Sequence, residues 1–138
     1  MSVTSNKRKH FAFSLDLHSG VPVYRQIIDQ VAGGIAAGAL AGGDQLPTVR
    51  QLAVDLSINP NTVVRAYREL ELGGLLETNQ GTGTFISSHR ISRRDAERER
   101  QLNQIIGDFV ARAGAAGFTV DDLIEQLRAM APEPTRRR

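Results

Sequence analysis

The sequence predicts an α+β fold in which three helices precede a β-hairpin and a charged pair of helices ends the chain. Three observations support this prediction. Apolar residues recur at helical spacing after Pro22, two clear helix starts follow at Thr48 and Asn59, and glycines at 81 and 83 separate two short strand patterns. The order of these signals, rather than any one of them, defines the expected architecture.

The first helix is expected to begin at Pro22, because proline suits the first helical turn. Its apolar positions follow a helical period: Tyr24, Ile27, Ile28, Val31 and Ile35. We expect it to fade near Gly42 and Gly43. Upstream, the alternation of apolar and polar residues over 13–17 predicts a short strand.

Two short helices are expected next, in close succession. Leu46–Thr48 opens the first, where Thr48 and Gln51 have the spacing of a capping box. Asn59 suits the N-cap of the second, and Pro60 suits its first position. Since Pro60 also disfavours helical geometry at Asn59, the first helix cannot continue through it. Two short helices joined by so tight a turn have the dimensions of a helix-turn-helix.

The second of these helices is expected to end at Gly73 and Gly74. Residues 75–78 and 84–86 then have strand patterns, and residues 79–83 between them have the composition of a hairpin turn. Helices followed by a hairpin in this order predict a winged helix-turn-helix over residues 11–88.

The remaining chain predicts a helical dimerisation module over residues 89–131. A charged amphipathic helix is expected at 92–113, followed by a loop at 114–117 and a helix capped by Thr119 with Asp122 three residues later. The apolar stripe is too small for an independent core, so we expect it to pack against a second copy of the chain. The predicted dimerisation residues are Leu102, Ile105, Ile106, Phe109, Leu123 and Leu127. Residues 1–10 and 132–138 are expected to be a disordered basic arm and a disordered tail.

Composition excludes several classes of protein. The chain has no cysteine, which excludes disulfides and thiolate metal sites. No apolar segment follows the basic N-terminus or is long enough to span a membrane, so we expect a cytoplasmic protein. His10, His18 and His89 lie in separate segments, and no set of nucleophile and base is present, so neither a metal, nor a cofactor, nor an enzyme is expected. The net charge of only +2 means that DNA affinity would depend on local placement of basic residues.

Three ordered motifs, at 46–53, 59–63 and 81–85, resemble the GntR family of bacterial regulators. Within that family, the residues 59–63 that begin the second short helix, together with the short two-helix tail, resemble the YtrA subfamily. The resemblance implies a transcription factor, most simply a repressor, that binds a pseudo-palindromic operator as a homodimer. It also implies that the regulated operon encodes a transporter.

The resemblance and the local chemistry together define a predicted DNA interface. Arg50 matches a family arginine that contacts DNA, and Gln80 with Gly81 matches the tip of the wing. The complete predicted set is Thr48, Arg50, Asn59, Asn61, Thr62, Arg65, Arg68, Gln80 and Gly81. Pro60 and Val64 stand where many members have arginine, so operators of other subfamilies do not transfer to this chain.

Simpler interpretations remain open for several of these residues. Asn59 suits a helix cap without any DNA role, and Arg65 or Arg68 has the spacing to pair with Glu69 or Glu71. At the level of function, the alternatives are an activator, an effector-binding sensor, and a protein-interaction module that does not bind DNA. A small-molecule effector is left open.

Overall fold

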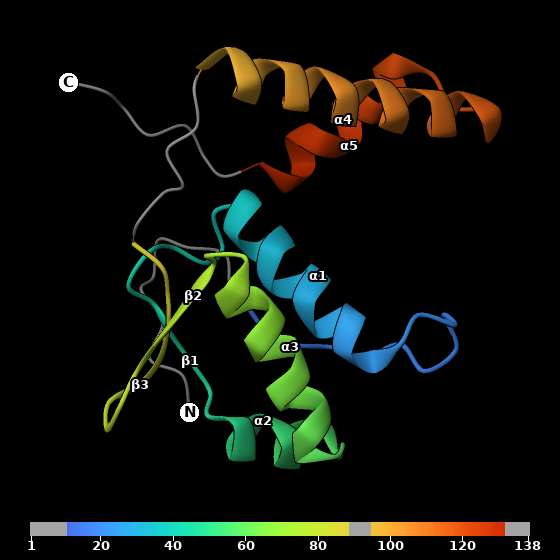
Figure 1. The fold of residues 1–138 in the computed structure, drawn as a ribbon. Coiled ribbons are helices and arrows are strands. Elements are labelled where there is room, and N and C mark those ends of the chain that lie inside the picture. The colour runs from blue at the N-terminus through green and yellow to red at the C-terminus, as the bar shows by residue number, and fades with distance from the viewer. Residues whose placement is uncertain (1–10, 89–94, 132–138) are drawn as a thin grey trace. The chain divides into compact units, whose positions relative to one another are not determined.

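The structure is a computed structural model that describes residues 11–88 and 95–131. The chain divides into two compact units, with the boundary between residues 90 and 91 (Figure 1). The predicted arm at 1–10 and tail at 132–138 lie outside the described residues. Within residues 11–88 and 95–131, no helix is both long and apolar enough to cross a membrane.

The first unit is a winged helix-turn-helix, as the sequence predicts. Its elements are α1 (Val23–Ala36), β1 (Gln45–Leu46), α2 (Val49–Leu56), α3 (Pro60–Leu72), β2 (Leu76–Asn79) and β3 (Gly83–Ile86). The strands form an antiparallel sheet of order β1-β3-β2, in which Leu46 lies opposite Thr84 and Leu76 opposite Ile86. The predicted hairpin strands are confirmed to within one residue at each end.

The caps of α2 and α3 are those predicted. The hydroxyl oxygen of Thr48 accepts from the Gln51 amide at 3.1 Å, and the Gln51 side chain accepts from the Thr48 amide at 3.1 Å. Asn59 Oδ1 accepts from the Asn61 amide at 2.8 Å, and Pro60 occupies the first helical position. The turn between the helices depends on Ser57, which adopts a left-handed conformation with φ of 55°. These caps fix where each short helix begins.

The core of the first unit is aliphatic and centres on α3. Helix α3 contacts α1, α2 and β2, and four of its residues are buried, so it lies in the middle of the unit rather than at its edge. The buried apolar residues are Ile27, Val31, Leu40, Leu46, Leu52, Ala53, Val63, Ala66, Tyr67, Leu70, Leu76 and Ile86. Burying large aliphatic side chains contributes about 1.5–3 kcal/mol each.

The strand predicted at residues 13–17 is wrong. This segment pairs with glutamine side chains of α1 instead of with another strand. Gln26 accepts from the Asp16 amide at 2.8 Å and donates to the Asp16 carbonyl at 2.9 Å, while Gln30 bonds both main-chain groups of Ser14. The two glutamines stand one helical turn apart, so they meet alternate residues of the extended segment. They therefore satisfy the backbone groups that a sheet would otherwise satisfy.

The predicted end of the first helix is also wrong. Helix α1 stops at Ala36, well before Gly42, because Gly38 adopts a φ of 78° and the chain then turns back. The Leu40 amide donates to the Gly34 carbonyl at 3.0 Å, which places the Leu40 side chain in the core. Strand β1 follows where the sequence predicted only the opening of a helix.

The second unit contains α4 (Asp95–Ala115) and α5 (Val120–Met130). Helix α4 ends two residues later than predicted, and the predicted positions 92–94 lie outside the described residues. The predicted cap of α5 is confirmed: Thr119 and Asp122 form a reciprocal capping box. The hydrogen bonds from the Thr119 amide and hydroxyl hold the pKa of Asp122 below its ordinary value. From Ala96 to Ala131, no described side chain is buried.

Gly33 and Gly34 of α1 allow a matched test of this packing. A methyl group at Gly33 would meet open space, whereas one at Gly34 would lie 2.9 Å from the Phe11 ring and 3.1 Å from Leu40 Cδ1. Gly33→Ala should therefore stabilise the unit by up to about 1 kcal/mol, through helix propensity alone. In Gly34→Ala the required shift of Phe11 and Leu40 should offset that gain. Thermal unfolding followed by circular dichroism compares them, and equal gains would show that Phe11 does not pack there.

Candidate nucleic-acid interface

Three segments that carry predicted DNA contacts lie at one end of the first unit. Figure 1 shows α2, the start of α3 and the tip of the β2–β3 hairpin together at the lower end of this unit. One hydrogen bond fixes α3 against the segment that precedes α2, because Tyr67 Oη donates to the Pro47 carbonyl at 2.7 Å. A second joins α3 to β2, where Thr78 Oγ1 donates to Glu71 at 2.9 Å.

Arg50 occupies the first turn of α2 with its side chain exposed. Among the residues that the structure describes, it pairs with no acidic side chain. Thr48, directly before the helix, is exposed and uses its hydroxyl oxygen to accept the capping bond. Its hydroxyl proton is still available to donate, since a hydroxyl can donate and accept at once. The start of α2 thus offers a guanidinium and a hydroxyl to an anionic ligand.

The start of α3 offers amide groups. Asn59 does act as the helix cap, which is the simpler of its two interpretations, but only its Oδ1 is used. The NH₂ group of Asn59 and the exposed side chain of Asn61 are the amides available at this end of α3. Thr62 is half-buried, and its amide donates to the Asn59 carbonyl at 3.0 Å. The three predicted residues are therefore close together, with the side chains of Asn59 and Asn61 exposed and that of Thr62 half-buried.

The two arginines of α3 have different surroundings. The Arg65 guanidinium lies 3.7 Å from the centre of the Tyr24 ring on α1, and its Nε is 3.8 Å from Glu69 Oε1. Pairing between Arg65 and Glu69, one of the alternatives open from the sequence, is thus present. Arg68 is exposed and makes no ion pair within the described part of the chain.

The turn of the wing requires its glycines. Gly81 has a φ of 81° and Gly83 a φ of 127°, which are conformations that L side chains rarely adopt. A methyl group at Gly83 would also lie 2.7 Å from Gln45 Nε2, which donates to the Thr82 carbonyl at 3.2 Å. Gln80 and Gly81 are exposed at the tip. The simpler, conformational reason for these glycines therefore holds, and it leaves the tip free of bulky side chains.

Sequence reasoning missed three residues that position this surface. Tyr67 is absent from the predicted interface, yet its hydroxyl is the link to Pro47. Burial raises the pKa of Tyr67 well above its ordinary value, so the hydroxyl keeps the proton that it donates even at a pH where an exposed tyrosine would lose it. Tyr24 and Gln45 support Arg65 and the wing turn, and no spacing in the sequence indicates either contact.

The apolar stripe of the second unit is exposed in the single chain. The predicted dimerisation residues Leu102, Ile105, Ile106, Phe109 and Leu127 are between 41% and 57% exposed, and Leu123 is half-buried. Further large apolar side chains are exposed beside them: Phe118, Val120, Ile124 and Met130. Helices α4 and α5 thus present a substantial apolar surface that this unit does not cover by itself.

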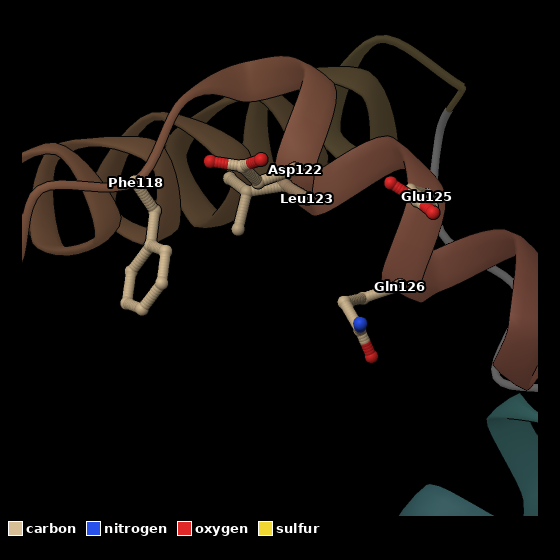
Figure 2. Close-up of a pocket in the computed structure, with 5 residues that line it drawn as sticks. All are labelled: Phe118, Asp122, Leu123, Glu125 and Gln126. Carbon is tan, nitrogen blue, oxygen red and sulfur yellow. The ribbon is translucent and has the colours of Figure 1, made fainter.

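One hollow of about 360 Å³ lies against α5. Figure 2 shows the side chains that line it: Phe118, Asp122, Leu123, Glu125 and Gln126. Four of the five belong to α5, and Phe118 lies two residues before the helix begins. The hollow is therefore a depression beside one helix rather than an enclosed cavity. It contains two carboxylates and no cationic group, and it does not indicate a class of effector.

The comparisons with known proteins agree with this geometry. Residues 23–86 match the family described as "Bacterial regulatory proteins, gntR family". An HTH-type transcriptional regulator of Mycobacterium tuberculosis is 43% identical over 113 residues, which cover 82% of this chain and 88% of that protein. The HTH-type transcriptional repressor YtrA of Bacillus subtilis is 34% identical over 119 residues, covering 86% and 92%.

A solved structure, YtrA from Sulfolobus acidocaldarius, described as a GntR-family transcription factor, is similar over most of its length. It is 34% identical, with a TM-score of 0.55, and the match covers 72% of this chain and 97% of that one. Because these matches include the tail as well as the winged unit, they bear on the subfamily and not only on the fold. The chain belongs to the gntR family of bacterial transcriptional regulators and is YtrA-like within it.

Proposed function

We propose that this regulator is a repressor that binds a pseudo-palindromic operator as a homodimer. The observation that carries the proposal is the convergence of α2, the start of α3 and the wing tip at one end of the first unit. A helix-turn-helix places the N-terminal residues of its second helix at base edges in the major groove. Repression is favoured because the related protein of Bacillus subtilis is named a transcriptional repressor.

Each segment then has a distinct task. Arg50, with no acidic partner among the described residues, suits guanine or a phosphate, and Asn61 suits a bidentate contact with adenine. Thr48, Asn59, Thr62 and Arg68 surround them as further contacts. Arg65, held against Tyr24, suits a phosphate beside the groove better than a base inside it. Gln80 and Gly81 are the proposed minor-groove contacts, because a tip without bulky side chains lets the backbone approach closely.

The homodimer follows from the second unit. Exposed apolar surface of this extent costs free energy in water, and large patches of this kind mark interaction sites. A second copy supplies an identical apolar stripe, and isologous pairing is the commonest way to cover one. Two copies would then present two recognition helices to half-sites about one helical turn apart.

The setting of this activity also belongs to the proposal. We place it in the cytoplasm, at an operon that encodes a transporter, as the resemblance to the YtrA subfamily implies. An effector, if one acts on this protein, is a small molecule whose class neither α4 nor α5 indicates. The relatives are DNA-binding regulators rather than enzymes.

Arg50→Ala should weaken operator binding by about 1–3 kcal/mol if the guanidinium contacts guanine. If it contacts a phosphate, the loss should be similar on every duplex, and the salt dependence should become shallower. Fluorescence anisotropy with the operator and a scrambled duplex separates these two cases. The matched control is Arg98→Ala, which removes the same charge from an exposed position of α4. Unchanged affinity of a folded Arg50→Ala variant would remove Arg50 from the interface.

Phe109→Asp should convert the dimer into a monomer, because the new carboxylate would be buried without a partner in the contact between copies. Operator affinity should fall with it, since each half-site would be bound singly. Gln104→Asp places the same charge on the opposite side of α4 and should leave the dimer intact. Sedimentation measures the mass of both variants, and circular dichroism verifies that α4 is still helical. A Phe109→Asp variant that is still dimeric at low micromolar concentration would place the interface elsewhere.

A further inference from the structure

Val64 is an exposed apolar residue in the middle of the polar surface of α3. Its side chain is 43% exposed, while its neighbour Val63 is fully buried. With 3.6 residues per turn, positions i, i+3 and i+7 share one side of a helix, so Val64 stands in a row with Asn61 and Arg68. Both of those residues are exposed. Val64 is thus flanked by an amide and a guanidinium, each a group that contacts bases or phosphates.

Contacts at the end of this row show which way it faces. Glu71 lies seven residues after Val64, two turns along the same side, and accepts a hydrogen bond from Thr78 of β2 at 2.9 Å. Arg65, about 100° further around the helix, lies against Tyr24 of α1. Val64 is therefore on the wing side of α3 and in its second turn, near the end that carries the predicted DNA contacts.

We propose that Val64 reads the C5-methyl group of a thymine in each operator half-site. The inference rests on the proposed operator binding and adds a base preference to it. An alkyl side chain neither donates nor accepts a hydrogen bond, and the thymine methyl is the apolar group that the major groove offers. Valine also suits the contact because its branched Cβ restricts χ1 in a helix, so its methyl groups lose little freedom when they meet the base.

The chemistry also defines what Val64 rejects. Cytosine presents no methyl group at the equivalent position and adds an amino donor, which would lose its water against Val64 without gaining an acceptor. An arginine at this place in the helix would instead favour guanine. The exposed valine thus predicts a half-site preference for thymine over cytosine at one position.

The test begins with an operator obtained by selecting duplexes from a random library with the full chain. Each thymine is then replaced by uracil, which removes the C5-methyl group and keeps every hydrogen-bonding group. For the wild-type chain we expect uracil at one thymine position per half-site to weaken binding about fourfold. This is the change in affinity that corresponds to the free energy of burying one methyl group. For Val64→Ala, which lacks both γ-methyl groups, the same replacement should have no measurable effect.

Leu72→Ala is the matched control, because Leu72 is 81% exposed in the last turn of the same helix, away from the predicted contacts. In Leu72→Ala, the loss of affinity caused by replacing thymine with uracil should equal that of the wild type. The inference is overturned if no uracil position weakens binding, or if the weakening is the same in Val64→Ala. Failure to select any preferred duplex would instead contradict the proposed function itself, so the two failures are distinguishable.

Discussion

The hydrogen bond from Tyr67 to the Pro47 carbonyl is the contact on which the geometry of the first unit depends. Tyr67 is only 6% exposed and its ring lies in the core, while its hydroxyl reaches the main chain directly before the cap of α2. Loss of this bond would leave a buried polar group without a partner, at a cost of about 1–3 kcal/mol. The same side chain thus packs the core and fixes the distance between the start of α2 and α3. That distance determines how Arg50 lies relative to Asn61.

The other contacts extend this arrangement to the wing. Glu71 and Thr78 join α3 to β2, and Gln45 of β1 supports the hairpin turn through the Thr82 carbonyl. Each bond is modest in free energy, about 0.5–1.5 kcal/mol. Their combined effect is geometric, because α2, α3 and the wing are each held to a neighbour whose position the core fixes. The second unit differs in kind: its side chains from Ala96 to Ala131 are exposed or half-buried, so the single chain gives it no buried core.

The sequence was sufficient wherever a local rule decides the structure. Asn59 and Pro60 begin a helix through their own backbone preferences, and the Thr48 capping box depends on residues three positions apart. Predictions failed where distant residues decide. The alternation at 13–17 is typical of a strand, but the main-chain groups of Ser14 and Asp16 bond glutamine side chains sixteen and ten residues away instead of a neighbouring strand. The two-residue strand β1 is too short to leave any period in the sequence.

The candidate site shows the same limit. The sequence indicated which segments carry polar and basic groups, but not that Arg65 lies over Tyr24, forty-one positions away in the chain. Likewise, seven-residue spacing puts Val64 and Glu71 on one side of α3, but it does not indicate that this side faces β2. Such contacts arise from how α1, α3 and the sheet pack, and the spacing of residues along the chain does not indicate them.

The most direct measurement of the central claim is the affinity and stoichiometry of the full chain on a selected palindromic duplex over a series of salt concentrations. The account predicts two chains per duplex, with a Kd of about 10⁻⁸ to 10⁻¹¹ M near physiological salt. It also predicts that log K falls linearly with log salt concentration, because basic side chains displace counterions from phosphates. Equal and weak binding to every duplex, or saturation at one chain per palindrome, would contradict it.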